Sequence, residues 1–208
     1  MKSLYNFIIT PLNKRYDNEL RIGNKKLIVN TSIEEFEFIS RLAKVLAVPT
    51  AYETEIKIGD TIIVHHNIFR RWYDNQGEAR NSASYFTEEM YFAAPDQIYL
   101  YKHDTKWQTF GGYCFIKPIK HKEDSLNSND TDLIGVVKYN DTYLEDKGIK
   151  EGDLVGFPPK REWRFLIDEE LLYCMKSNNI FAKYEYKGNE VEYNPSWAQS
   201  SRRINKSC

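Results

Sequence analysis

The sequence predicts an all-β protein built from two tandem domains, and three observations carry this prediction. Tyr, Phe and Trp make up 14% of the 208 residues, and aromatic side chains favour half-buried strands over long helices. Short apolar runs recur every 8 to 12 residues or so, a spacing typical of small β-barrels. Four short sequence blocks also occur twice in the same order, which indicates a tandem duplication.

The clearest repeated block is a Gly-Asp pair followed by an apolar strand, at 56–64 and again at 149–157. The Gly-Asp pair supplies a turn and the β-branched run supplies the strand. The other three blocks pair 9–12 with 116–119, 44–48 with 134–137, and 96–100 with 178–182. The chain therefore divides, with a join near Asp104 to Gly112, into domains at 1–105 and 110–192 and a polar, basic tail at 193–208 that is either flexible or docks on a neighbouring subunit.

The other elements follow from local patterns. Trp163 to Met175 reads as a hairpin of two strands joined by an acidic turn at 168–170. The segment 33–43 fits a helix with a capping Thr or Ser and a strand equally well. The connection at 120–132 is polar, with Leu126 as its only apolar residue.

Charge and apolar content exclude several functional classes. The 29 Lys and Arg residues balance 30 Asp and Glu residues, whereas a generic nucleic-acid binder needs a clear excess of cations. No apolar run approaches the roughly 18 residues of a membrane span, and the first residues do not form a signal peptide. We therefore expect a soluble, cytosolic protein that binds neither membranes nor nucleic acid.

Few residue patterns point to catalysis or to a cofactor. Cys114, Cys174 and Cys208 are too widely spaced for paired zinc ligands or a disulfide framework, and Cys174 lies in an apolar run typical of a core. His65 and His66 could suggest a metal, but neighbours on a strand point to opposite faces, so polar residues at a strand end are the better account. We expect no enzyme activity, metal or cofactor, because no dinucleotide or phosphate-binding glycine loop or carboxylate pair is present.

From the join onward, the second half resembles the GroES family of 10-kDa co-chaperonins. The residues that carry the resemblance are 115–119, 135–137, 148–157, 167–175 and 178–182. The first half is similar to a more divergent copy of the same domain, so the whole chain resembles the double-domain co-chaperonins of plastids and some phages. The resemblance implies two partly open antiparallel β-barrels and a ring that caps a chaperonin chamber.

The resemblance also implies a docking loop after the first strand, where this family presents an apolar tripeptide to the chaperonin. The best match here is Leu27, Ile28 and Val29, within the region from Asn13 to Ala43. The alternative is that these three residues form an ordinary strand packed in their own domain. Because the second half lacks such a tripeptide, at most one half is expected to bind a chaperonin in this manner.

Two segments combine cations with aromatic side chains, Arg70 to Tyr73 and Arg161 to Phe165. Such residues either pair within a hairpin or contact a protein partner, and base stacking is a distant third choice. We expect Trp72, Tyr73, Trp163 and Phe165 to serve hairpin or inter-subunit packing.

The leading hypothesis is a ring-forming co-chaperonin whose partners are a GroEL-like chaperonin and copies of itself. The rival hypothesis is a structural or assembly protein, for example of a phage particle, that uses the same barrels as interaction modules. The lid would act in the cytoplasm, of the host if the protein is viral, and the structural protein in the virion.

Overall fold

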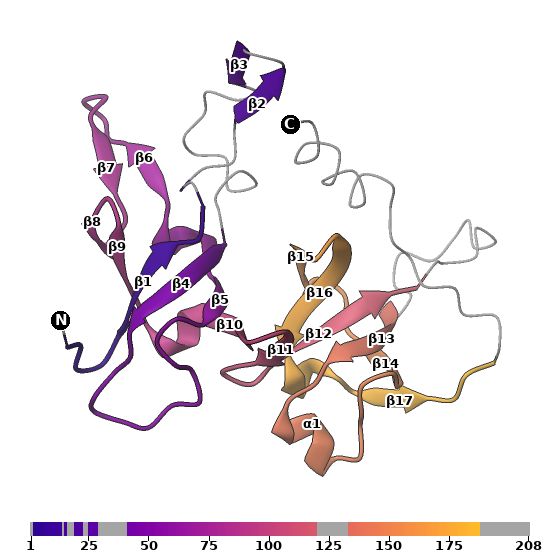
Figure 1. Cartoon of the computed structure of the whole chain (residues 1–208). Helices are drawn as coiled ribbons and strands as arrows, with labels where there is room; N and C mark the ends of the chain where they lie inside the picture. Colours follow the sequence, from indigo (N-terminus) through magenta and orange to yellow (C-terminus); the bar gives the residue numbers. More distant parts are fainter. Residues whose placement is uncertain are drawn as a thin grey trace. The chain divides into compact units, whose positions relative to one another are not determined.

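A computed structural model describes residues 2–13, 15, 19–22, 25–28, 41–119 and 133–187 (Figure 1). The described residues are mostly β, with antiparallel sheets of seven and six strands, two short hairpins and one α-helix. The chain divides into two compact units, Met1–Gly111 and Gly112–Cys208. The mainly β class is confirmed. The boundary falls between two glycines with φ of 69° and 73°, a left-handed conformation that glycine adopts at little cost.

The sheet of unit 1 has the strand order β11-β10-β5-β4-β1-β9-β8. Its strands are β1 (Phe7–Pro11), β4 (Leu42–Ala47), β5 (Thr61–Val64), β8 (Tyr85–Thr87), β9 (Met90–Ala93), β10 (Ile98–His103) and β11 (Lys106–Thr109). Two hairpins stand apart from this sheet, β2 (Glu19–Ile22) with β3 (Lys25–Ile28), and β6 (Arg71–Tyr73) with β7 (Ala79–Asn81). The 3-10 turns are η2 (His66–Ile68) and η3 (Pro95–Gln97).

The sheet of unit 2 has the strand order β15-β16-β12-β13-β14-β17. Its strands are β12 (Tyr113–Pro118), β13 (Leu133–Tyr139), β14 (Leu154–Phe157), β15 (Trp163–Ile167), β16 (Glu170–Lys176) and β17 (Ala182–Tyr184). The helix α1 (Thr142–Asp146) lies between β13 and β14, and the 3-10 turn η4 (Ser177–Asn179) precedes β17.

Six strands of unit 1 have counterparts in unit 2 in the same spatial order. The series β10-β5-β4-β1-β9-β8 corresponds to β17-β14-β13-β12-β16-β15. The register agrees as well, because Ile9 pairs with Val45 and Ile116 with Val137, each next to an irregularity in the first strand. Unit 1 adds β11, so the predicted domain end at 105 falls inside its β10–β11 hairpin. This common topology is what a tandem duplication requires.

The Gly-Asp turn has the same hydrogen bonds in both units. Gly59 and Gly152 have φ of 95° and 90°, and each donates its N–H to a valine carbonyl of the neighbouring strand at 2.8 Å. The carboxylates of Asp60 and Asp153 each accept the N–H of the lysine three residues earlier, at 2.8 and 2.7 Å. The predicted turn followed by a strand is confirmed at both places.

The structure corrects one pair of repeat blocks. The sequence blocks 44–48 and 134–137 place Val45 beside Gly135, whereas the strand register makes Val45 equivalent to Val137. A shift of two residues keeps every side chain on its face of the sheet, so the alternation of apolar residues cannot detect it.

The hairpin predicted from Trp163 to Met175 is confirmed as β15 and β16. Its turn contains only Asp168 and Glu169, with φ of 48° and 67°, while Glu170 already pairs with Ile167. Two consecutive residues with positive φ form the turn type whose twist matches a hairpin.

Each unit has its own apolar core. The core of unit 1 lies on β1, β4, β5, β9, β10 and η2 and includes Phe7, Ile9 and Phe69, while that of unit 2 includes Ile116 and Phe157. Cys174 is fully buried, as predicted. Cys114 is also buried, and burial raises the pKa of its thiol to about 12.

Several predicted segments lie outside the described residues. They are the helix-or-strand segment 33–40, the polar connection 120–132 and the tail 193–208. Leu42 and Ala43, the last two residues of the predicted segment 33–43, belong to β4. Within the described ranges, no helix is long and apolar enough to cross a membrane.

Candidate functional site

The predicted docking tripeptide begins in a strand. Leu27 and Ile28 belong to β3, which pairs with β2 so that Leu27 lies opposite Leu20. Val29 lies outside the described residues. The β2–β3 hairpin belongs to the connection between β1 and β4, the region in which the resemblance places the docking loop.

The predicted hairpin aromatics divide into surface and core residues. Trp72 and Tyr73 are 36% and 50% exposed on β6, and Trp163 is 50% exposed on β15. Phe165 is only 4% exposed, with its ring centroid 5.6 Å from that of Phe115. Phe165 thus packs in the core of its own unit and offers no surface to a neighbouring subunit.

The two cation and aromatic segments are not equivalent parts of the repeat. Trp163 lies on β15, whose counterpart in unit 1 is β8. Trp72 lies on β6, in a hairpin inserted between β5 and β8, and this hairpin projects from the sheet (Figure 1). In unit 2 only 158–162 separate the corresponding strands β14 and β15. The two segments therefore share their composition but not their position in the repeat.

His65 and His66 directly follow the end of β5, as expected of polar strand-end residues. β5 ends at Val64, so the histidines do not alternate along a strand; His65 caps η2 and the two rings stack at 4.4 Å. Burial lowers the pKa of both imidazoles, and the neighbouring His65 and Arg41 help to lower that of His66 to about 4. In the part of the chain that the structure describes, no three His, Cys, Asp or Glu side chains could hold a metal ion together.

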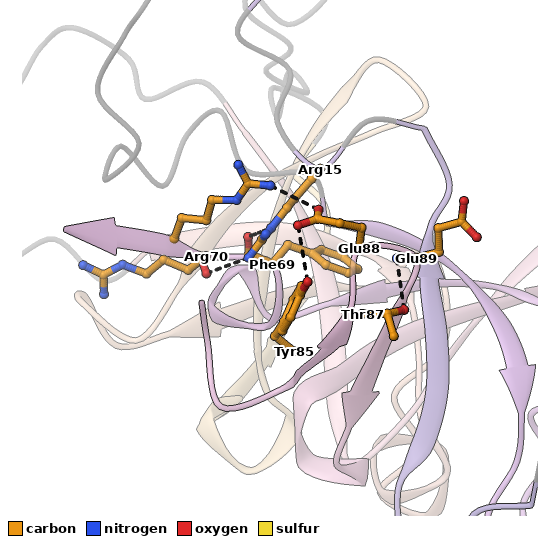
Figure 2. A network of polar contacts seen from close by, with 8 residues as sticks. Arg15, Phe69, Arg70, Tyr85, Thr87, Glu88 and Glu89 are labelled. Atoms are coloured by element: carbon orange, nitrogen blue, oxygen red, sulfur yellow. Dashed lines mark hydrogen bonds and ion pairs between the residues drawn. The ribbon is translucent and has the colours of Figure 1, made fainter. Parts of the chain in front are cut away.

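A buried arginine marks a site that sequence reasoning missed. Arg15, just beyond β1, is 9% exposed. Its Nε donates to the carbonyl of Phe69 at 2.6 Å and its Nη2 to the carbonyl of Arg70 at 3.1 Å. Figure 2 shows the guanidinium directed at these two carbonyls. Two adjacent backbone acceptors therefore hold one planar cation.

Tyrosine rings complete the site around the guanidinium. Its central carbon lies 5.3 Å from the ring centre of Tyr91 and 5.7 Å from that of Tyr85, within the range of cation–π attraction. Tyr91 in turn packs edge-on against Phe69 and Tyr85. Burial raises the pKa of the Tyr91 phenol, an effect that the charge of Arg15 opposes.

Charged groups form the outer part of the same site. Glu88 accepts a hydrogen bond from the Tyr85 hydroxyl at 3.3 Å (Figure 2). It also accepts one from Arg71 at 3.2 Å. The Arg71 to Glu88 ion pair is exposed, so solvent screens it and it contributes little to stability. We name the set Arg15, Phe69, Arg70, Tyr85, Tyr91 and Glu88 the Arg15 site.

No protein-family model matches this chain, and no curated protein matches it. The family resemblance therefore rests on the sequence blocks quoted above.

Proposed function

We propose that the protein is a co-chaperonin-like lid made of two GroES-like, partly open β-barrel domains. It assembles as a ring of identical subunits and caps a chaperonin chamber through Leu27, Ile28 and Val29. The proposed role needs no catalytic residue and no cofactor, because the protein acts by binding alone.

The observation that carries the proposal is the position of the long connection in each repeat. Unit 1 has its connection between β1 and β4, and unit 2 between β12 and β13, which are the equivalent strand pairs. In unit 1 the Leu12 N–H donates to the Leu42 carbonyl at 3.0 Å and closes the base of the connection. The resemblance places its docking loop after the first strand, the same point in the repeat.

Binding through three apolar side chains is weak for one subunit and strong for a ring. Burying three such side chains contributes on the order of a few kcal/mol, offset by the entropy of ordering the segment. Several connections on one ring then multiply the affinity, because each later contact is intramolecular.

Native mass spectrometry with a GroEL-like chaperonin and ADP tests the proposal. We expect a ring of the protein alone and a ring-on-chaperonin complex in the mixture. The double variant Leu27→Asp, Val29→Asp should form the ring but lose the complex. Leu4→Asp, at a 66% exposed leucine outside the connection, is the matched control and should keep it. A complex that survives the double variant would show the docking assignment to be wrong.

One observation favours the second candidate, a structural or assembly protein such as a phage particle component. Leu27 and Ile28 are paired in β3 with β2, as expected of a segment that packs in its own domain. This candidate predicts slow hydrogen exchange at the Leu20 and Leu27 amides in the free protein, and self-assembly without chaperonin binding.

A further inference from the structure

Arg15 is a permanently charged side chain that is almost completely buried. A guanidinium keeps its proton at all ordinary pH values, so burial is costly unless acceptors surround it. The Arg15 site supplies such acceptors through two carbonyls and two ring faces.

We propose that Arg15 is a positioning residue, held in a guanidinium site of Phe69, Arg70, Tyr85 and Tyr91, that fixes how the chain leaves β1 toward the connection carrying Leu27, Ile28 and Val29. The effect on partner binding rests on the function proposed above. The binding of the Arg15 side chain in the Arg15 site does not depend on that proposed function.

The atoms that receive Arg15 are themselves fixed in the body of unit 1. Phe69 is fully buried, and its ring packs edge-on against Tyr91 with 4.8 Å between centres. The Arg70 carbonyl also accepts the Ser82 N–H at 3.2 Å. Phe69 and Arg70, which lie 54 and 55 positions further along the chain, therefore hold their carbonyls in fixed positions for Arg15.

The shape of the site favours arginine over lysine. A guanidinium is planar and presents several donors in a fixed fork, so it can bond two carbonyls and face aromatic rings together. A lysine ammonium is a compact point charge that lacks this fork. Arg15→Lys therefore keeps the charge but loses the paired hydrogen bonds.

Arg15 adds a second anchor to the chain at the start of the connection. The first is Leu12, bonded to Leu42 on the sheet; the second, three residues later, lies against the residues that follow η2. Two anchors define the direction of the chain, and a segment that starts from a fixed direction loses less entropy on docking.

The experiment uses the full chain with Arg15→Ala, Arg15→Lys and the control Arg80→Ala. Arg80 is an exposed arginine paired with Asp74 and Glu78. We expect Arg15→Ala to weaken chaperonin binding by about tenfold or more, because a connection without this anchor loses more entropy on docking. Arg15→Lys should weaken it nearly as much and Arg80→Ala should not, while all three keep the ring. Millimolar methylguanidinium, which can enter the vacated site but is not joined to the chain, should not restore binding by Arg15→Ala; restored binding would show that Arg15 fills the site and does not anchor the chain.

Hydrogen exchange of the Leu12 amide, measured without chaperonin, separates the two proposals. We expect faster exchange in Arg15→Ala, with or without methylguanidinium. If the wild type binds no chaperonin, the proposed function fails, and this exchange still tests the positioning role. Unchanged exchange, or unchanged affinity where the wild type binds, overturns the role of Arg15. If Arg15→Ala does not fold, hydrogen exchange of the Leu12 amide is compared between Arg15→Lys and the wild type instead, and unchanged exchange again overturns the role of Arg15.

Discussion

The Tyr91 hydroxyl is buried and, among the described residues, has no hydrogen-bond partner. A buried polar group without a partner costs about 1 to 3 kcal/mol relative to a solvated one. The Tyr91 ring, by contrast, is needed for packing on Phe69 and for the contact with Arg15.

Replacing Tyr91 by Phe should therefore leave stability unchanged or raise it. We expect a free energy of unfolding within about 0.5 kcal/mol of the wild type, or higher, in urea titrations. Tyr91→Ala, which also removes the ring, should lose about 3 kcal/mol or more. A loss above about 1 kcal/mol in Tyr91→Phe would mean that the hydroxyl has a partner.

Two glycines of unit 2 leave different amounts of room for a side chain. A Cβ at Gly135 would clash with Cγ2 of Ile116 and would lie 2.7 Å from the backbone oxygen of Lys117. A Cβ at Gly156 would lie 2.7 Å from the ring of Tyr184, which is exposed at the surface and can move.

Gly135→Ala should accordingly destabilise the protein more than Gly156→Ala. We expect losses of about 3 and about 1 kcal/mol, because overpacking costs most where backbone atoms must shift. Thermal and urea unfolding of both variants provide the measurement. Equal losses would mean that the strand carrying Gly135 relaxes as easily as a surface ring.

Arg15 illustrates which residues sequence reasoning cannot assign. Its acceptors are backbone carbonyls of Phe69 and Arg70, and a carbonyl has no signature in the amino-acid sequence. From the sequence alone, an arginine in a polar connection is expected to be exposed to solvent. Only the fold brings these groups together.

At the scale of elements, the turns were the most predictable parts of the molecule. The Gly-Asp turns and the β15–β16 hairpin follow from local chemistry, since Gly59 and Gly152 adopt the positive φ that such turns need. The sequence predicts hairpin pairing for Arg70 to Tyr73 but does not locate the second strand β7, because short strands with mixed polar residues lack a clear period.

The short turn η2 should make stability depend on pH. Burial, together with His65, Arg41 and Arg70, lowers the pKa of His66 from 6.5 to about 4. The unfolded chain thus binds a proton more readily than the folded protein between these two values. Stability is therefore lost as the pH falls from 6.5 toward 4.

Urea unfolding at pH 7 and pH 5 checks this dependence. We expect His66→Gln to show a smaller loss of stability between the two pH values than the wild type does. Glu145→Gln, on the exposed side of α1, should behave like the wild type. An unchanged pH dependence in His66→Gln would exclude this histidine as the responsible group.

At the scale of the whole molecule, the main feature is that each unit has its own apolar core. Regions with separate cores can lose protection in separate cooperative steps. A substitution in one core is therefore expected to act within its own unit.

Hydrogen exchange of Gly135→Ala tests this separation. Amides in strands β12 to β17 should lose protection by about 100-fold, in line with the expected loss of about 3 kcal/mol. Amides in 42–110 should remain as in the wild type. A parallel loss in both ranges would show that the two units unfold as one.

The common strand register of the two units has a consequence for folding. A nascent chain with two similar first strands can insert β1 where β12 belongs, a misassembly characteristic of repeat proteins. The cross-strand pairs oppose this exchange: Phe7 lies opposite Ala93, whereas Cys114 lies opposite Met175. A swapped strand would set Phe7 against Met175, and two large side chains overfill the space of one large and one small. Divergence between the two copies thus favours the pairing of each first strand with the strands of its own unit.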